Sequence, residues 1–370
     1  MNEKGKIGIM TFHEANNYGA VLQAFALQVA TSKLYNSEIL NFHNKKMWRM
    51  YRPIPFYFNP INTFKHWARI IIFPRCCLDR LKRRKRFSDF SKKYLKKSKK
   101  YFPNTIKEAN RSYDAFITGS DQVWNPAAAL SWEYFLEFAD NSKKFSYAAS
   151  FGANEINKEF KERIINDLSS FSSILVREKD GVNIVDSLNI NKIARMVCDP
   201  TFLLTKSQWI KELNLKEKKS GYIFVYTVAP QTHTIDAAKR LAEKEDIGII
   251  MCSSASGKRA YVKGTKSAMG IGPIEFMELI LNAKYVFTTS FHGLALSIIM
   301  NTPFFYELNQ MEKNCNSRIE NLVDIFDIKE REITSNVVIN KEIDWCKINY
   351  IKEKYVSESK IILFESLNGI

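Results

Sequence analysis

The chain has 370 residues, 45% of them hydrophobic, and it carries a formal net charge of +16. This length suggests two domains, and the apolar content excludes a disordered or a fibrous chain. The charge is local: residues 41–100 contain 19 Lys and Arg against two acids, or 19 − 2 = +17, and the other 310 residues sum to −1. We therefore expect an anionic partner at one segment, and not nucleic acid bound along the whole surface.

The predicted elements alternate between short apolar runs and stretches with apolar side chains at helical spacing. The first pair is a buried strand at 6–12 (KIGIMTF) followed by a helix at 19–34. Further strands are expected at 113–118, 145–150, 174–177, 195–198, 222–227, 248–252, 285–289 and 304–307. Helices are expected at 158–171, 234–245, 274–282, 292–301 and 350–367. This repetition predicts an α/β fold with two Rossmann-like domains that face each other across a cleft.

The lysine-rich segment 215–221 (LKEKKSG) separates the two series of elements. We therefore expect an N-terminal Rossmann-like domain at 1–215, with 41–100 as a basic aromatic insertion. A C-terminal Rossmann-like domain is expected at 216–345. The remaining residues, 346–370, are expected to form a helix that packs back across the two domains.

The basic block interrupts the alternation of strands and helices. Residues 61–73 place aromatic and aliphatic side chains on one helical face, and 80–100 are helix-prone and strongly cationic. Such segments are typical of interfacial helices on an anionic membrane. A solvated basic helix pair with its own aromatic core is the alternative. Nucleic-acid binding is not favoured, because no RNA- or DNA-reading motif accompanies the block.

The cellular location is predicted from what the chain lacks. Its six cysteines show no C-x-x-C spacing, so they are expected to be reduced thiols of a cytosolic protein. The first residues lack the apolar core of a signal peptide, and no run of about 18 apolar residues occurs. We expect a cytoplasmic protein that is peripheral at the inner face of the cell membrane.

Two residues that follow predicted strands are candidates for acid–base chemistry, because ligands of open α/β sheets bind at the carboxyl ends of strands. His292 follows the strand at 285–289 and begins a helix. It could act as a general acid, or it could only hydrogen-bond within its own turn. Asp121 lies in the segment GSDQVWNP at 119–126, where it could be a base or a helix cap.

Two arginines are candidates for binding anions. Arg177 ends a strand and could bind a carboxylate or phosphate, or it could pair with Glu178. Arg318 begins a helix and could hold a second anion, or form an exposed salt bridge. Asp199 precedes a proline and favours an Asx-type turn. The sequence contains no Walker A loop, no GxGxxG and no metal-ligand spacing, so no metal is expected.

Several segments occur together in an order that resembles the polysaccharide pyruvyl transferase family. They are NYGAVLQ at 17–23, GSDQVWNP at 119–126, SYAASFG at 146–152, VREK at 176–179, CDPT at 198–201, Gly272-Pro273 with Glu275-Phe276, SFHG at 290–293 and NSRI at 316–319. The resemblance covers nearly the whole chain. It implies a fold similar to the two-domain GT-B glycosyltransferases. It also implies transfer of a pyruvyl group from phosphoenolpyruvate to two hydroxyls of a sugar, forming a cyclic ketal.

The resemblance also assigns expected roles, with the acceptor on the N-terminal side and the donor on the C-terminal side. His292 would be the general acid and Asp121 the base. The donor would be bound by Arg177, Ser290, Gly293 and Arg318. The acceptor would be bound by Asn17, Tyr18, Gln122 and Trp124. Ser290 stands where some members of the family have an arginine, so Arg318 or Lys284 would have to substitute for it.

The first hypothesis is therefore a pyruvyl transferase that acts on a lipid-linked or polymeric envelope saccharide. Its partners would be phosphoenolpyruvate as co-substrate, the lipid-linked saccharide acceptor and an anionic membrane surface contacted through 61–100. No cofactor and no nucleic acid are expected. The alternatives are a GT-B-like glycosyltransferase that uses a nucleotide sugar, and a membrane-adsorbed scaffold without catalysis.

Overall fold

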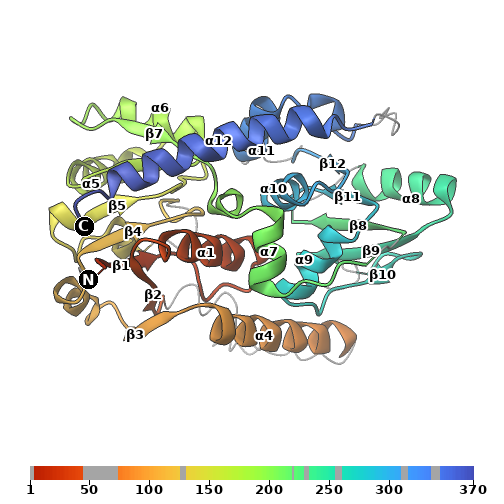
Figure 1. Cartoon of the computed structure of the whole chain (residues 1–370), viewed down its shortest axis with the longest axis horizontal. Helices are drawn as coiled ribbons and strands as arrows, with labels where there is room; N and C mark the ends of the chain where they lie inside the picture. Colours follow the sequence, from red (N-terminus) through yellow and green to blue (C-terminus); the bar gives the residue numbers. More distant parts are fainter. Residues whose placement is uncertain are drawn as a thin grey trace. The chain divides into compact units, whose positions relative to one another are not determined.

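The computed structural model describes residues 4–44, 74–125, 131–218, 221–228, 233–254, 261–309, 316–334 and 342–370. These residues form two compact units (Figure 1). The N-terminal unit takes the described residues among 1–48, 91–204 and 349–370. The C-terminal unit takes those among 49–90 and 205–348. The helix expected at 61–73 lies outside the described residues.

The N-terminal unit is built on a parallel five-stranded sheet with the order β3-β2-β1-β4-β5. The strands are β1 (Lys6–Met10), β2 (Asn36–Phe42), β3 (Lys97–Tyr101), β4 (Ala115–Thr118) and β5 (Lys144–Ser146). A second parallel pair, β6 (Ile174–Val176) and β7 (Ala194–Met196), is connected to the sheet by single bridges from Phe145 and Ala149. The carboxyl ends of all these strands therefore point the same way.

Helix α1 (Tyr18–Thr31) follows β1 and is buried on nearly every side. Its residues are apolar around most of the circumference, which is the pattern of a helix inside a core. The side chain of Asn17 caps its start by accepting a hydrogen bond from the Ala20 amide at 3.3 Å. The buried amide of Gln28 bonds both backbone groups of Lys96, at 2.7 and 3.0 Å. A polar side chain in this helix is thus matched to a polar partner.

The other helices of the N-terminal unit are shorter. They are α5 (Lys158–Ser169), α6 (Lys179–Ser187) and four 3₁₀ turns, η1 (Ile106–Arg111), η2 (Trp132–Phe135), η3 (Asn141–Lys143) and η4 (Pro200–Leu203). Two long helices, α4 (Pro74–Tyr94) and α12 (Trp345–Ser366), each begin in the C-terminal unit and end in the N-terminal unit.

The C-terminal unit repeats the parallel arrangement, with the order β10-β9-β8-β11-β12. Its strands are β8 (Tyr222–Thr227), β9 (Gly248–Ser253), β10 (Lys266–Ser267), β11 (Tyr285–Thr288) and β12 (Phe304–Tyr306). Its helices are α7 (Lys206–Leu213), α8 (Thr234–Glu245), α9 (Pro273–Leu281), α10 (Phe291–Met300) and α11 (Ser317–Phe326), with a 3₁₀ turn η7 (Lys329–Arg331).

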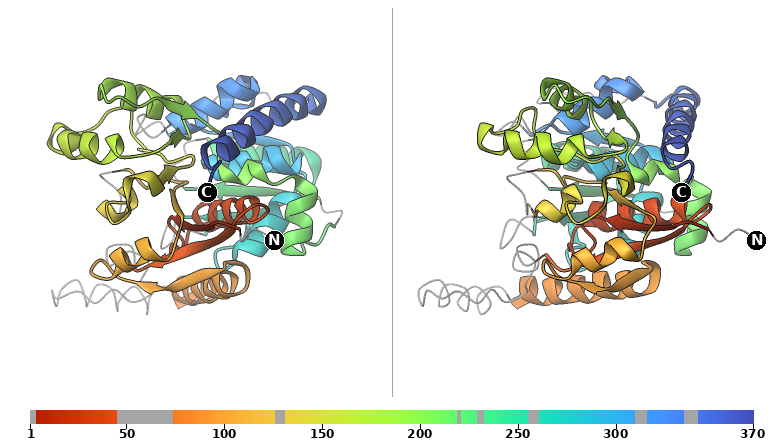
Figure 2. Two further views of the ribbon diagram at one scale, coloured as in Figure 1. Left: turned by 60° about the vertical axis from the view of Figure 1, so that its left-hand side comes forward. Right: turned by 90° about the vertical axis from the view of Figure 1, so that its left-hand side faces the viewer.

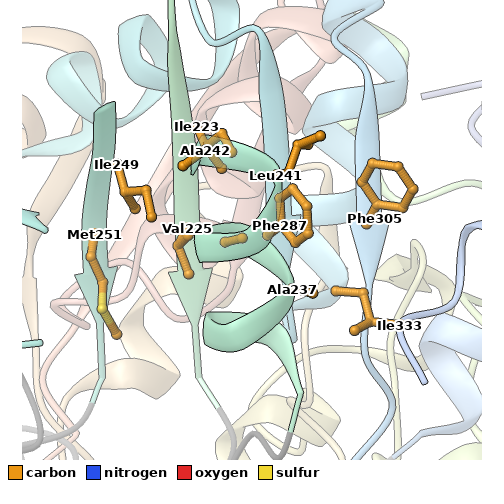
Figure 3. Close-up of a cluster of buried hydrophobic side chains, with 11 residues drawn as sticks. Ile223, Val225, Ala237, Leu241, Ala242, Ile249, Met251, Phe287, Phe305 and Ile333 are labelled. Carbon is orange, nitrogen blue, oxygen red and sulfur yellow. The ribbon is translucent and has the colours of Figure 1, made fainter. Parts of the chain in front are cut away.

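The core on one face of this second sheet is apolar throughout. Side chains of β8, β9, β11 and β12 meet the inner face of α8 (Figure 3). Val225 and Leu241 lie in this cluster and are almost fully buried. The strands carry apolar residues on both faces, as expected for a parallel sheet covered by helices on both sides.

The two sheets share one topological property that locates their binding edges. In each sheet the chain builds outward from a central strand in one direction and then returns to build in the other. The reversal lies between β1 and β4 in the N-terminal unit, and between β8 and β11 in the C-terminal unit. Ligands of open α/β sheets bind at such reversals, beside the carboxyl ends of the strands.

The α/β class and the two parallel Rossmann-like units are confirmed by these sheets. The boundaries between the two units lie at 204/205 and 348/349. The sequence suggested domain boundaries at 215/216 and 345/346. Because its residues 74–90 cluster with the C-terminal unit, the segment 41–100 is divided between the units. Among the described residues, none of the helices combines the length and apolar content needed to cross a membrane.

The basic segment 80–100 differs from the helix expected there. The helix ends at Tyr94, and residues 97–101 form β3 at the edge of the N-terminal sheet, with Lys97 beside Ile39. An edge strand tolerates lysines, because one side of it is open to water, and charge there discourages pairing with other chains. Because of its many lysines, the sequence of β3 was interpreted as part of a helix.

Candidate functional site

The reversal point of the N-terminal sheet is organised by two polar side chains and the backbone of Ser120. Gln23 of α1 donates a hydrogen bond to the Thr11 hydroxyl at 2.7 Å, and its side-chain oxygen accepts from the Ser120 amide at 3.0 Å. The Thr11 hydroxyl donates to the Ser120 carbonyl at 3.2 Å. Gln23 thus ties the loop after β1 to the loop after β4.

The loop after β4 has a backbone shape that presents Asp121 at the strand end. Gly119 has φ of +116°, and a Cβ there would lie 2.3 Å from the Tyr147 carbonyl oxygen, so only glycine fits. Asp121 itself has φ of +71°, a left-handed conformation that Asp tolerates better than most residues. Its carboxylate accepts from the Gln122 amide at 2.9 Å.

Arg177, directly after β6, is surrounded by three carboxylates. Its guanidinium lies 3.3 Å from Glu178, 3.1 Å from Asp199 and 3.9 Å from Asp121. The residue is only 2% exposed. Burial by itself lowers the pKa of Arg177, but the surrounding carboxylates outweigh this effect and raise it. The charged guanidinium is therefore held by the protein's own acids.

The carboxylates around Arg177 are themselves fixed by neighbouring donors. Asp199 accepts from the Thr201 amide at 3.0 Å, as the predicted Asx-type turn requires, and from the Ser120 hydroxyl at 3.2 Å. Glu178 accepts a short hydrogen bond from the Ser150 hydroxyl. Of the two roles left open for Arg177, the geometry favours the ion pair with Glu178, because a donor would have to displace bonded carboxylates.

The four residues predicted to bind the acceptor are used mainly inside the unit. Asn17 caps α1, and Tyr18 is fully buried. Trp124 is also fully buried, in an aromatic cluster with Phe135, Phe151 and Phe171. The Gln122 side chain accepts a hydrogen bond from Asn125 at 3.0 Å. Asn17 and Tyr18 begin α1, and Gln122 and Trp124 shape the loop after β4. Direct contact of these four residues with an acceptor remains a prediction.

A second polar cluster, which we did not single out from the sequence, lies after β1 and β2. The His13 ring contacts Asn41 Oδ1 at 3.3 Å, and the His43 Nδ1 lies 3.3 Å from a Glu14 carboxylate oxygen. Burial lowers the pKa of His13, while the charge of Glu14 opposes that effect. The rim of the cluster is aromatic, since Phe102 packs edge-on against His43 and is 39% exposed.

The same rule that selected His292 could have found this cluster. His13 and His43 each come shortly after a strand, at its carboxyl end. The pair of Glu14 and His43 joins residues 29 positions apart, and the parallel alignment of β1 and β2 brings them together. We refer to Glu14, His43 and Phe102 as the rim cluster.

The reversal point of the C-terminal sheet contains His292 in the first turn of α10. Ser290 is the N-cap, and its hydroxyl accepts from the Gly293 amide at 3.4 Å. The Thr289 hydroxyl accepts from the Val228 amide at 2.9 Å, which joins the loops after β8 and β11. His292 is 7% exposed. His292 therefore lies in the first turn of a helix, and the backbone amides at a helix start stabilise anions.

Gly293 allows α10 to approach the strands closely. A Cβ at this position would lie 2.3 Å from the Thr288 hydroxyl oxygen, which already donates to the Tyr226 carbonyl at 2.8 Å. Glycine is therefore required by packing, and its predicted contact with the donor would be through its backbone. The start of α10, with His292, is placed by this close approach.

Arg318 lies in the first turn of α11, which packs against α10. The residue before that helix, Asn316, exchanges two 2.9 Å hydrogen bonds with the backbone of Asn309. Arg318 is only partly buried. An anion-binding role for it remains a prediction, as does substitution by Lys284, which instead pairs with Glu245.

Other parts of the C-terminal unit offer different environments. The start of α8 is already occupied by a carboxylate of the protein, because Glu307 accepts from the amides of His233 and Thr234 at 3.0 and 2.8 Å. A hollow of about 310 Å³ lies near the amino end of β8, at the opposite end of that strand from the reversal point. Its lining includes Lys216, Tyr222 and Lys266.

The described residues offer little for a metal or a disulfide. Across these ranges, no group of three or more His, Cys, Asp or Glu side chains is arranged to hold a metal ion. The described cysteines are free thiols: Cys76, Cys77, Cys198, Cys252 and Cys346. Cys315 lies outside the described residues.

Comparison with protein families gives one match. The model described as polysaccharide pyruvyl transferase matches residues 17–309. The matched range contains every predicted site residue except Arg318, and it begins after β1. No curated protein matches the chain.

Several solved structures resemble the chain over most of its length. The UDP-GlcNAc 2-epimerase from Neisseria meningitidis bound to UDP-GlcNAc is 9% identical, covering 98% of this chain and 99% of that one, with a TM-score of 0.49. The epimerase from Methanocaldococcus jannaschii, in complex with UDP-GlcNAc and UDP, is 13% identical over 94% and 98%, with a TM-score of 0.47. The E. coli heptosyltransferase WaaC is 12% identical over 82% and 88%, with a TM-score of 0.34. At these values the likenesses say nothing about activity.

Proposed function

The chain belongs to the polysaccharide pyruvyl transferase family, and from this premise we propose that it moves a pyruvyl group from phosphoenolpyruvate to a sugar. The acceptor is a sugar of a lipid-linked or polymeric envelope saccharide. Two of its hydroxyls become joined to one carbon of the donor as a cyclic ketal. The family match supports the transferase class, and the chemistry below supports the donor and the product.

The reaction begins with protonation of the donor. A general acid gives a proton to the methylene carbon of phosphoenolpyruvate, which becomes a methyl group and leaves C2 electron-deficient. A sugar hydroxyl attacks C2 and loses its proton. Phosphate then leaves with the C–O bonding electrons, and a second hydroxyl closes the ring as it loses its proton. Of the two protons released, one restores the acid and one goes to phosphate or solvent.

The single observation that carries this proposal is the position of His292. It lies in the first turn of α10, at the reversal point of the C-terminal sheet, with Ser290 as the cap. Backbone amides at a helix start favour the carboxylate or phosphate of a donor. An imidazole in the same turn can deliver a proton to a donor held there. The proposed general acid and the backbone amides that would bind the donor thus lie in one short segment.

We assign the acceptor side to the rim cluster of the N-terminal unit. The Glu14–His43 pair joins a carboxylate to an imidazole, which is the arrangement of a general base and the group that orients it. The Glu14 side chain is 26% exposed, whereas that of Asp121 is 12% exposed and bonded within its own loop. Phe102 adds an exposed aromatic ring on which a sugar can pack.

The proposal is tested by incubating the protein with phosphoenolpyruvate and polyprenyl-linked or soluble saccharides. We expect release of phosphate and a product heavier by one pyruvyl ketal, detected by mass spectrometry and lost in mild acid. If UDP-sugars stabilise the protein against heat and phosphoenolpyruvate does not, the glycosyltransferase alternative replaces this function.

The acceptor side is tested with Glu14→Gln in the phosphate-release assay. This variant should raise KM for the saccharide while KM for phosphoenolpyruvate stays constant.

A further inference from the structure

Helix α4 presents a basic face to solvent with two leucines on it. Its 21 residues contain nine Lys and Arg and two Asp, or 9 − 2 = +7. Leu78 and Leu81 are 56% and 44% exposed. With Lys85 and Lys92 they follow spacings of three, four and seven residues, so all four share one side of the helix.

The opposite side of α4 is the one that is buried. Phe87 and Phe90 are 4% and 3% exposed. Because Leu78 lies nine residues before Phe87, at 100° per residue the two side chains project from opposite faces. The exposed leucines therefore do not belong to the core that the phenylalanines enter.

The helix is fixed to the C-terminal unit by polar contacts on its flanks. Asp79 accepts from the Tyr261 hydroxyl at 2.8 Å, and Arg86 donates to the Gly270 carbonyl at 3.0 Å. Arg86 also pairs with Glu275 at 3.2 Å. Close packing supports these bonds, because a Cβ on Gly272 would lie 2.6 Å from the Arg86 Cβ. The basic face is thus held in a fixed orientation; Figure 2 shows the helix from two further sides.

We infer that this face of α4 docks on an anionic lipid bilayer surface, with Leu78 and Leu81 entering the headgroup region. Exposed apolar side chains among Lys and Arg are the pattern of a helix that lies in the membrane interface. The lysines and arginines are complementary to the negative surface potential of such a leaflet. Duplex nucleic acid would use the positive charge but has no need of two leucines at the centre of the face. The inference concerns binding alone and does not depend on the reaction.

The experiment uses the full chain and vesicles, with co-sedimentation as the readout. Vesicles of phosphatidylcholine alone are compared with vesicles that also contain phosphatidylglycerol, at low and high salt. We expect binding to the anionic vesicles only, with the affinity falling as salt screens the charges.

Two α4 variants separate the charge from the leucines. The first replaces Lys82, Arg84, Lys85 and Lys92 by Ser, and it should bind about 10²–10³-fold more weakly. The second, Leu78→Ser with Leu81→Ser, should bind about tenfold more weakly while keeping the salt dependence. All six side chains are exposed, and melting curves check that each variant folds.

A matched control removes four exposed bases elsewhere by changing Lys158, Lys161, Arg240 and Lys354 to Ser. It should bind vesicles within about threefold of the unmodified chain, because it leaves the α4 face intact. Equal loss in the control and in the α4 charge variant would overturn the inference, since net charge alone would then explain binding. Unchanged binding of both α4 variants, or tighter binding to duplex DNA than to anionic vesicles, would also overturn it. If the charge variant does not fold, the leucine variant decides.

Discussion

The two reversal points, between β1 and β4 and between β8 and β11, follow the same topological rule with different side chains. Near the first, one guanidinium and three carboxylates are buried together around Arg177. At the second, the described loop residues are mostly hydroxyls and small residues, with His292 in the first helical turn. Among the described loop residues, an ion-paired charge cluster is therefore found at the first reversal point and not around His292.

The difference shows that charge at a strand end is not the same as reactivity. In the N-terminal unit the charges satisfy one another, and the loops that carry them are fixed as a result. At the second reversal point, hydroxyls bond backbone amides: Thr289 accepts from the Val228 amide and Ser290 accepts from the Gly293 amide. A donor with several negative charges would therefore meet less competition from protein anions at the second reversal point than at the first.

The largest expected effect concerns the second reversal point, between β8 and β11. His292→Ala should lower kcat for ketal formation by about 10²–10⁴-fold, because the proposed general acid is removed. His233→Ala is the control, since this half-buried histidine at the start of α8 is outside the proposed site. Initial rates of phosphate release measure both variants. Activity of His292→Ala equal to that of the control would exclude the acid role.

The next largest effect concerns the charged residues near the first reversal point, between β1 and β4. Arg177→Met should destabilise the fold by about 3–5 kcal/mol, because it leaves three buried carboxylates without their cation. Arg195→Met, on the exposed side of β7, should change stability by less than about 0.5 kcal/mol. Urea unfolding midpoints measure both. A stable Arg177→Met protein with only a raised KM for phosphoenolpyruvate would restore the donor-binding role.

A smaller effect concerns the packing that places His292. Gly293→Ala should cost about 1–3 kcal/mol, because the new Cβ would overlap the bonded hydroxyl of Thr288. Gly248→Ala is the matched control, since no atom lies within 4 Å of its Cβ position. Thermal unfolding compares the two. Equal melting temperatures would mean that α10 can shift, and that its approach to β11 is not fixed.

The smallest effect concerns a carboxyl outside both reversal points. Burial raises the pKa of Asp167 to about 6, helped by the nearby charge of Glu137. The folded state therefore favours the protonated form, and this stabilisation is present at low pH and lost as pH rises through about 6. Asp167→Asn should raise the melting temperature increasingly from about pH 4 to about pH 7. The exposed Asp186→Asn should show no such trend, and a constant offset for both would contradict the assignment.

Much of the fold could be predicted from local pattern. Strands such as 222–227 and 285–289 were expected from short apolar runs, and they are β8 and β11. The position of His292 at a helix start was expected for the same reason. β3 was missed, because five residues that include three lysines (KSKKY) match no pattern of a buried strand. Its place depends on pairing with β2, about 60 residues earlier in the chain.

The roles of polar residues near strand ends were harder to predict. Trp124 and Tyr18 were expected to face an acceptor, yet both are fully buried. Arg177 was expected to bind a donor or to pair with Glu178, and Asp199, 22 residues further on, also bonds it at 3.1 Å. Each outcome depends on a partner contributed by a different strand or loop. Such partners cannot be read from the neighbouring residues.

The sequence by itself determined the α/β class, the family and the position of His292 after its strand. This was possible because hydrophobic periodicity and short motifs can be recognised within a few consecutive residues. Only the tertiary structure shows which charged side chains are already paired within the protein. Parallel strands bring distant residues to one edge, where Arg177 and its three acids satisfy one another and Glu14 meets His43. On α4 the reverse holds, because burial of Phe87 and Phe90 leaves the leucines and lysines of the other face in water.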